Sequence, residues 1–280
     1  MKKSALCVYT TITQGYDDLR QPTYHEPGYD YICFCNELPI GYCGIWEIRH
    51  FDTRGFNSKM SSRIPKMMPH ELLTEYEHSL YIDANVDIVD DFIFRSIDSL
   101  IERQVLVGHL DHVQRNCMYL EIDFCMLNGY DSFLPLARMY WKLLKEKYPY
   151  GTGLFENNVI FRRHNDIKVI EANRIWWDCY CRYSKRDQCS LMYAYWKTGI
   201  RPELLLPEKT NARLYSTHLS RILHNEGKDK KEAHSSIAYY FFRMMNKLLH
   251  AAVILSGWRN RTLDKYNENY YIPQPFRQIK

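Results

Sequence analysis

Acidic and amide side chains follow directly after an apolar run in the first half of the chain. Residues 80–82 have the character of a buried strand, and Asp83, Asn85 and Asp87 come just after them. Side chains of an extended chain alternate between two faces, so these three groups are expected to face the same way. Their oxygens suit Mg²⁺ or Mn²⁺, which also bind phosphate. The stretch predicts a metal and diphosphate site; the alternative is a strand-to-turn junction that bonds local backbone.

Basic residues suited to phosphate lie upstream of this stretch. Residues 57–68 have a helical pattern that Pro65 is expected to kink, and Lys59, Arg63 and Lys66 fall at positions i, i+4 and i+7. Side chains at this spacing project from one helix face. The segment therefore predicts a cationic wall beside the diphosphate. A solvated basic face is the alternative.

A polar cluster surrounds the expected start of a later helix. It contains His109, Asp111, His112, Arg115 and Glu121. Several of these are of metal-ligand type, but the H-x-D-H spacing is not a standard zinc spacing. The cluster is therefore not predicted to be a zinc site.

A second polar group stands at the start of the helix expected at 186–197. Ser184 can cap this helix, and Asp187 at its third position would complete an acidic variant of a capping box. This purely structural role is the alternative to any chemical role for Asp187.

The elements that must position these residues predict an α/β fold. Strand patterns cover 5–11, 31–36, 44–51, 80–82, 104–108, 157–162 and 204–206, and helical patterns cover 57–68, 92–103, 130–147, 167–183 and 186–197. Ligands of open α/β sheets bind beyond the carboxyl ends of the strands, where the Asp83 stretch is expected. Neither G-x-G-x-x-G nor G-x-x-x-x-G-K-[ST] occurs, which argues against a dinucleotide fold and a P-loop.

Composition narrows the class of protein. A length of 280 residues with 46% hydrophobic residues predicts one large α/β domain, or a domain with a small appendage. The net charge is only +4 and no basic arm is present, so nucleic acid is not the leading partner. The 23 tyrosines and 6 tryptophans suit sugar and nucleotide pockets as well as ordinary cores.

Cysteine usage and hydropathy predict a cytoplasmic location. Nine cysteines are scattered, and two pairs have C-x-C rather than C-x-x-C spacing, so reduced, mostly buried thiols are expected. The apolar run after the N-terminal Met1-Lys2-Lys3 is too short for a signal peptide, and no run is long enough to cross a bilayer.

The pattern changes towards the C-terminus. Residues 225–233 form a charged break, and 237–258 are apolar and aromatic with Arg243, Lys247 and His250 interleaved. We expect a helix that packs on the domain; pairing with a partner or peripheral contact with the inner membrane face are alternatives. The predicted domains are therefore 1–225 and a C-terminal helical extension, 226–280.

Separated motifs in residues 8–193 together match one pattern. They are Gly15-Tyr16-Asp17, Lys66-x-x-Pro69-His70, Tyr81-Ile82-Asp83-Ala84-Asn85, His112-x-x-Arg115 with Tyr119 and Glu121, Glu156-Asn157-Asn158, Arg162-Arg163-His164, Trp176-Trp177, and Ser184-x-Arg186-Asp187-Gln188. On these motifs the chain resembles the glycosyltransferase-like domain family of plant mucilage-related proteins and bacterial polysaccharide clusters. That family is similar to GT-A nucleotide-sugar transferases, and related to the retaining family-8 enzymes.

The resemblance implies a GT-A (Rossmann-like) fold, with a mixed, mostly parallel sheet flanked by helices. It also implies a D-x-D element for a divalent metal, Mn²⁺ or Mg²⁺. Here this element reads Asp83-Ala84-Asn85, with Asn in place of the second Asp, and Asp87 is an alternative ligand. A late histidine completes the metal set in the family; His218 is adopted here, with His224 as the other candidate.

The implied activity is transfer of a hexosyl group from a nucleotide-sugar donor, a UDP-sugar, to a saccharide or glycolipid acceptor in bacterial surface polysaccharide synthesis, with retention favoured over inversion. A non-catalytic nucleotide- or carbohydrate-binding scaffold and a metal-dependent nucleotide-sugar hydrolase are the alternatives. The implied site residues are Asp187, Gln188 and Glu156 for catalysis; Thr10, Tyr16, Asp17, Lys59, Arg63, Lys66 and Arg115 for the nucleotide and its diphosphate; His112, Glu121, Asn157, Trp176 and Trp177 for the sugar and acceptor; and Asp83, Asn85 and His218 for the metal.

Overall fold

The computed structural model describes residues 5–13, 17–207 and 216–221, together with the single positions 210, 212, 241, 244, 245 and 248. This part of the chain divides into two compact units. The first, called the sheet unit, contains residues 5–111, 156–177 and those described from 194 to 221. The second, called the helical unit, contains residues 112–155 and 178–193.

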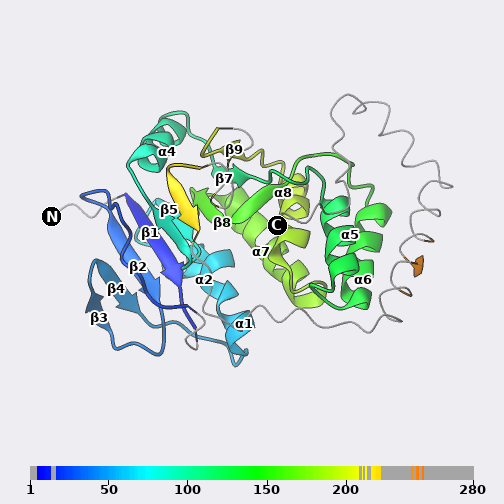
Figure 1. The fold of residues 1–280 in the computed structure, drawn as a ribbon, viewed down its shortest axis with the longest axis horizontal. Coiled ribbons are helices and arrows are strands. Elements are labelled where there is room, and N and C mark those ends of the chain that lie inside the picture. Colours follow the sequence, from blue (N-terminus) through cyan, green and yellow to red (C-terminus); the bar gives the residue numbers. More distant parts are fainter. Residues whose placement is uncertain are drawn as a thin grey trace, which may run out of the picture. The chain divides into compact units, whose positions relative to one another are not determined.

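The sheet unit is built on eight described strands in the order β3-β4-β2-β1-β5-β8-β7-β9 (Figure 1). They are β1 (Leu6–Thr11), β2 (Asp30–Phe34), β3 (Gly41–Cys43), β4 (Trp46–Arg49), β5 (His78–Ile82), β7 (Val107–Asp111), β8 (Phe155–Arg162) and β9 (Glu203–Leu204). Strands β4, β2, β1 and β5 run parallel, whereas β8 is antiparallel to β5. β1 and β5 are buried almost throughout, as expected of parallel strands covered on both faces.

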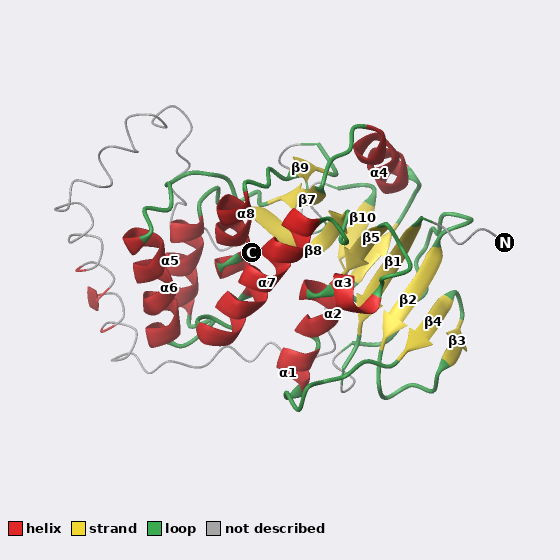
Figure 2. Ribbon diagram, turned by 180° about the vertical axis from the view of Figure 1, so that it is seen from behind, coloured by secondary structure: helices red, strands yellow, loops and turns green. Residues whose placement is uncertain are grey.

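Different helices cover the two faces of this sheet (Figure 2). The helices are α1 (Ser58–Ser61), α2 (Arg63–Met67), α3 (Pro69–Leu72), α4 (Phe92–Glu102) and the first part of α7 (Ile167–Arg182). On one face Ile97 of α4 joins a buried apolar cluster with Leu80 of β5. On the other face Arg162 of β8 contacts Lys66 of α2 and Asn173 of α7.

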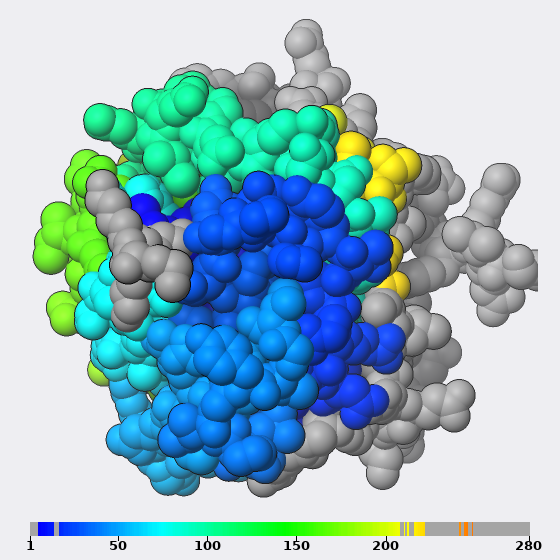
Figure 3. Space-filling model, turned by 90° about the vertical axis from the view of Figure 1, so that its left-hand side faces the viewer, coloured from blue at the N-terminus to red at the C-terminus, as the bar shows by residue number. Residues whose placement is uncertain are grey.

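The N-terminal loops extend the α4 face. Figure 3 views this unit from the side of β3 and β4, where the N-terminal segment (blue) lies against α4 (teal). Tyr29 donates a hydrogen bond to Asp98 of α4 across 3.0 Å. A separate two-stranded antiparallel ribbon pairs β6 (Val86–Ile88) with β10 (Leu219–Arg221).

The helical unit contains α5 (Met118–Asn128), α6 (Phe133–Lys145), the end of α7, the short 3₁₀ helix η1 (Asp187–Cys189) and the start of α8 (Leu191–Thr198). Its core is aromatic: the Tyr119 ring lies 5.0 Å from that of Tyr140 and 5.7 Å from that of Tyr150. Helix α5 ends at Gly129, whose φ of 66° is the left-handed conformation that favours glycine.

The predicted α/β fold class is confirmed by the mixed, mostly parallel sheet with helices on both faces. The prediction of one helix over 57–68 is wrong. Pro65 has no N–H to donate to the carbonyl of Ser61, and the helix is divided at Ser62 into α1 and α2. Lys59 is exposed and Lys66 is buried, so the predicted basic residues do not share one face.

Three other element boundaries differ from the predictions. The strand predicted at 44–51 is a hairpin of β3 and β4 that turns at Gly44 with a φ of 63°, the strand predicted at 104–108 is found three residues later as β7, and the helix predicted at 186–197 is η1 followed by α8. The helix predicted at 237–258 lies outside the described residues except at four positions, and the division at 225/226 stays a prediction. None of the helices in the described part of the chain combines the length and apolarity needed to cross a membrane.

Candidate functional site

The ends of β1 and β5 and the start of β8 place three polar residues in one row. β1 is parallel to β5, and β5 is antiparallel to β8. Continuing the two registers to the strand ends aligns Thr11, Asp83 and Asn158, and the Asp83 N–H donates to the Asn158 carbonyl across 2.8 Å. Because side chains alternate along each strand, the three point to the face that α2 and α7 cover.

Asp83 is held by two donors. Lys66 Nζ of α2 lies 3.2 Å from Asp83 Oδ1, and the Tyr81 hydroxyl donates to the same oxygen across 2.7 Å. The Lys66 side chain is only 3% exposed, whereas that of Asp83 is 32% exposed. Burial and the neighbouring Asp83 carboxylate raise the pKa of Tyr81 well above its ordinary value, so this phenol keeps its proton and acts as a donor.

A second cation, Arg162, lies buried on the same face. Its guanidinium donates to the Tyr9 hydroxyl (2.5 Å), to the Lys66 carbonyl at the end of α2 (2.7 Å) and to Asn173 Oδ1 (3.3 Å). All three acceptors are neutral. The Lys66 carbonyl and the Asn173 amide carry no charge, and burial raises the pKa of Tyr9, so its hydroxyl stays protonated. Lys66 and Arg162 are thus two buried cations on the face to which Asp83 points.

The predicted alternation of Asp83, Asn85 and Asp87 is wrong. The Val86 N–H donates to the Asp83 carbonyl across 2.9 Å, so residues 83–86 form a β-turn rather than extended chain. Asn85 sits in this turn and is buried. Both carboxylate oxygens of Asp87 are bound by Thr23, through its N–H at 2.8 Å and its hydroxyl at 2.7 Å. The stretch is thus a strand-to-turn junction, but its carboxylates bind the side chains of Lys66 and Tyr81 and the distant Thr23 rather than only local backbone.

Several buried polar atoms at these strand ends have no hydrogen-bond partner among the described residues. They are Oγ1 of Thr10 and Thr11 and both side-chain amide atoms of Asn157 and Asn158. Buried polar groups in folded proteins are nearly always paired with protein, ordered water or a ligand. Such atoms gathered at one sheet edge therefore favour a polar ligand or bound water there.

A pocket of about 250 Å³ adjoins the turn that follows Asp83. It is lined by Thr10, Leu19, Arg20, Gln21, Pro22, Thr23, Trp46, Ile82, Ala84, Val86 and Asp87. Trp46 is fixed because its indole N–H donates to the Arg20 carbonyl across 2.8 Å. The pocket thus combines an aromatic wall with hydroxyl, amide and carboxylate groups.

The predicted metal ligands do not fit a divalent ion. Asp83 Oδ1 is bound by Lys66 and Tyr81, and Asn85 offers at most a neutral amide oxygen in a turn. His218 lies on the β10 side of the ribbon, where its Nδ1 is 2.8 Å from Asp90 Oδ2. Within the described residues, no three His, Cys, Asp or Glu side chains converge as a metal-binding group.

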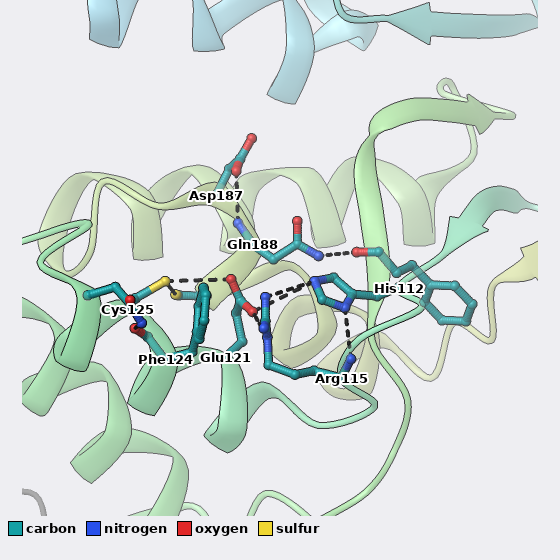
Figure 4. A network of polar contacts seen from close by, with 10 residues as sticks. His112, Arg115, Glu121, Phe124, Cys125, Asp187 and Gln188 are labelled. Atoms are coloured by element: carbon teal, nitrogen blue, oxygen red, sulfur yellow. Dashed lines mark hydrogen bonds and ion pairs between the residues drawn. The ribbon is translucent and has the colours of Figure 1, made fainter. Parts of the chain in front are cut away.

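The helical unit contains a separate polar network (Figure 4). The Arg115 guanidinium makes an ion pair with Glu121 Oε2 and lies 3.9 Å from the Phe124 ring centroid. His112 Nδ1 accepts from the Arg115 N–H at 3.1 Å, and the Cys125 thiol donates to Glu121 Oε1 at 3.5 Å. The side chains of Arg115 and Glu121 are 8% and 5% exposed. Arg115, predicted to bind phosphate, and Glu121, predicted to bind the sugar or acceptor, thus neutralise each other's charge.

Asp187 and Gln188 lie at the edge of this network, on η1 (Figure 4). Asp187 Oδ1 accepts from the Gln188 N–H at 2.9 Å, and the Gln188 side-chain amide donates to the Phe155 carbonyl. The predicted capping box is not formed, because the Ser184 hydroxyl binds Asp131 and the Arg186 N–H instead. Asp187 is half-buried, so its carboxylate keeps some exposed surface.

Glu156 is buried at the start of β8. Its carbonyl accepts from His109 Nδ1 at 3.1 Å, so the other ring nitrogen of His109 accepts from the Tyr195 hydroxyl at 2.8 Å. Burial lowers the pKa of His109 to about 3, which keeps the ring neutral. This backbone contact joins β7 to β8 and does not use the Glu156 carboxylate.

The other predicted site residues are scattered. Asp17 and Arg63 are half-buried, and Lys59 is exposed on α1. Trp176 is fully buried, and Trp177 keeps exposed surface beside Phe56, at a ring distance of 5.7 Å. Tyr16 lies outside the described residues. The assignments of these residues stay predictions.

The sequence argument missed Arg162 and Asn158 as site residues. A signal for Arg162 was present: it directly follows three apolar residues of a strand, and such a buried cation needs acceptors. No comparable signal marked Asn158, because its alignment with Asp83 depends on the antiparallel insertion of β8 beside β5.

Comparison with protein families gives one match. The model of the family described as "TOD1/MUCI70, glycosyltransferase-like domain" matches residues 36–211, more than half of the chain. The matched region includes the Asp83 stretch, the Arg115 network and the Asp187-Gln188 pair. Among curated proteins no sequence matched.

Solved structures give weaker likenesses. The bifunctional glycosyltransferase WbbM, in its apo form, is 14% identical, with 72% of this chain and 38% of WbbM covered and a TM-score of 0.43. Mouse xyloside xylosyltransferase 1, also apo, is 7% identical, with 70% and 84% covered and a TM-score of 0.40. The galactosyltransferase LgtC, in complex with donor and acceptor sugar analogues, is 10% identical, with 87% and 95% covered and a TM-score of 0.39. The chain thus spans little more than a third of WbbM, and its assignment rests on the family match.

Proposed function

Because the chain belongs to the TOD1/MUCI70 glycosyltransferase-like domain family, we propose that it transfers a sugar from a nucleotide-sugar donor, a UDP-sugar, to a saccharide or glycolipid acceptor. A role in bacterial surface polysaccharide synthesis is part of this proposal. The observation that carries it is the buried Lys66 ammonium beside Asp83, at strand ends where side-chain polar atoms of Thr11 and Asn158 have no partner among the described residues. A diphosphate is the anion that such a site suits best.

The chemistry of transfer explains why this charge matters. The bond between the anomeric carbon and the diphosphate oxygen breaks, and the anomeric carbon bonds to an acceptor hydroxyl oxygen, whose proton is released. Negative charge therefore develops on the departing diphosphate. Cations fixed in a site of low dielectric constant stabilise that charge without reorganising. Lys66 and Arg162 are fixed by burial and by their hydrogen bonds.

The pocket beside the turn is the proposed nucleoside site. Its volume of about 250 Å³ and its mix of Trp46, Thr10 and Asp87 suit a planar base and a ribose with hydroxyl groups. The buried Oγ1 of Thr10 has no partner among the described residues and can bond such a ligand. The family's divalent metal is not used in this proposal, because the described donor set does not fit it.

Asp187 and Gln188 are proposed to serve the sugar. A carboxylate near the anomeric carbon stabilises the positive, oxocarbenium-like charge that develops as the glycosidic bond breaks. Asp187 retains exposed surface for that role, and Gln188 is fixed by the Phe155 carbonyl. Asn157 and Trp177 are the proposed contacts for sugar or acceptor hydroxyls and rings. A retaining course is favoured through the family relationship.

The test is a panel of UDP-, GDP- and CMP-sugars followed by a turnover assay. We expect a UDP-sugar to raise the melting temperature most, and UDP release to accelerate when a saccharide acceptor is added. Equal UDP release with and without acceptor would indicate a hydrolase. Binding without release would indicate a scaffold. If no nucleotide sugar changes the melting temperature, the proposal is wrong.

A further inference from the structure

We infer that Lys66 takes the place of the divalent cation, so that the site binds a nucleoside diphosphate without metal. This inference rests on the proposed function and concerns how the diphosphate charge is neutralised. It follows from where the Lys66 ammonium lies, from the donors that surround Asp83, and from the positive groups near it.

The Lys66 ammonium already occupies one of the two oxygens that an ion on Asp83 would use. Nζ lies 3.2 Å from Asp83 Oδ1, and it is 5.0 Å from the centroid of the Tyr81 ring. An ion bound to that oxygen would displace a side chain that is only 3% exposed. A displaced ammonium would then have to find new solvation inside the protein, which is costly for a buried charge.

The anchor beneath Lys66 also opposes its displacement. The buried Arg162 donates to the Lys66 carbonyl at 2.7 Å, and the Tyr9 hydroxyl fixes that guanidinium at 2.5 Å. The end of α2 is thereby tied to β8 and β1. Lys66 is thus carried on a fixed backbone rather than on a loose loop.

The other metal ligands expected near Asp83 already have partners or would bind a metal ion only weakly. Asp87 gives both carboxylate oxygens to Thr23, and His218 pairs with Asp90. Asn85 supplies a neutral amide where a second carboxylate would be needed. Hard divalent ions take several oxygen ligands, usually including carboxylates, so one partly occupied carboxylate is a poor site.

Positive groups near Asp83 favour an anion over a second cation. The Lys66 ammonium already pairs with Asp83 Oδ1, and Arg63 places a further positive charge near Tyr81. These cations would repel a divalent ion and attract a diphosphate. Thr11 Oγ1 and the Asn158 amide, in the same row as Asp83, can bond phosphate oxygens.

The test is UDP binding to the full chain, measured by calorimetry in EDTA and in Mn²⁺. We expect Mn²⁺ to change the wild-type Kd by less than about threefold, and Lys66→Met to weaken binding in EDTA by at least about tenfold. The exposed Lys168 of α7 offers a control of the same type, and Lys168→Met should bind like wild type. Circular dichroism would establish that each variant is folded.

Asp83→Asn separates the two possible roles of this residue by the sign of the effect. If Lys66 replaces the metal, loss of the Asp83 charge removes repulsion, and UDP should bind in EDTA at least as tightly as to wild type. Binding that requires Mn²⁺ and is abolished by Asp83→Asn would overturn the inference and leave the proposed function standing. Failure of folded wild-type protein to bind UDP under either condition would overturn the proposed function, and this inference with it.

Discussion

The sheet unit and the helical unit each contain a buried pair of opposite charges, yet the two pairs are built differently. In the helical unit Arg115 and Glu121 are both below 10% exposed, and His112, Phe124 and Cys125 contact them from further sides. In the sheet unit Lys66 is buried, whereas Asp83 is a third exposed. We call the first pair closed, because both side chains are buried and satisfied by each other. The second pair is open, because Asp83 keeps exposed surface and can still interact with a ligand.

This difference teaches that burial of a charge pair does not by itself mark a binding site. A closed pair serves the fold, because removing either partner leaves an uncompensated charge in the interior. An open pair, with one partner still exposed, can serve a ligand. Variants of the two pairs should therefore differ in what they lose.

The largest expected effect is on stability, at Glu121. Glu121→Ala should lower the free energy of unfolding by about 3–5 kcal/mol, because Arg115 is left buried and unpaired. Urea denaturation measures this loss. The double variant Arg115→Met/Glu121→Ala should recover part of it, and Glu171→Ala on the exposed side of α7 should change stability by less than about 0.5 kcal/mol. A loss below about 1 kcal/mol for Glu121→Ala would mean that the pair is not closed.

The next effect concerns turnover, at Asp187. Asp187→Asn should reduce kcat by at least about 100-fold, equivalent to about 2.7 kcal/mol, because the charge opposing the oxocarbenium ion is lost. Its stability should be retained, since the Asn oxygen can still accept from the Gln188 N–H. A near-normal kcat would assign the whole helical unit to structure and sharpen the division.

We expect acid to destabilise the protein through two buried histidines of the sheet unit. Burial lowers the pKa of His109 to about 3 and of His164 to about 4, both below the ordinary value of about 6.5. The unfolded chain therefore binds more protons than the folded one below pH 6.5, and stability falls as pH falls. Each histidine should cost about 2 kcal/mol at pH 5.

Urea denaturation between pH 8 and pH 4 checks this prediction. His164→Gln should reduce the loss of stability on acidification by the contribution of one histidine, about 2 kcal/mol at pH 5. A flat stability profile from pH 7 to pH 5 in the wild-type protein would contradict the prediction.

The smallest effect is on stability at Asp83. Asp83→Asn should lower the free energy of unfolding by only about 1 kcal/mol, because the side chain is partly solvated and the Asn oxygen can still accept from Lys66 and Tyr81. Urea denaturation beside Glu121→Ala gives the direct comparison. Equal losses in the two variants would remove the distinction between an open and a closed pair.

The fold was largely predictable, because its strands are short apolar runs bounded by polar turns. β1, β5 and β8 and helices α4, α6 and α7 lie within a few residues of their predicted ranges. The prediction of a single helix at 57–68 failed because the helix is divided at Ser62, next to the Ser61 carbonyl that lacks an N–H from Pro65. The alternation after Asp83 failed because a turn replaced extended chain.

The types of residue at the site could be predicted from the sequence, but their contacts with one another could not. Lys66 and Asp83 were each placed at a diphosphate site, and they lie together. The pairing of Arg115 with Glu121 was not predicted. The sequence assigned Arg115 to the diphosphate and Glu121 to the sugar or acceptor, whereas the two side chains form an ion pair. Arg162 and Asn158 depend on the register of β8, a contact between distant segments that local pattern does not encode.

The insertion of β8 has a consequence for how the chain folds. The bond between Arg162 and the Tyr9 hydroxyl spans 153 residues, and β8 covers the open side of β5. Until β8 has been synthesised and paired, β5 remains an apolar edge strand with free backbone groups, a template for association with other chains. Contacts of such sequence separation form slowly. The last strand to reach the centre of the sheet therefore carries the cation that anchors α2, and a nascent chain stopped before residue 162 should aggregate rather than fold into a smaller version of the same unit.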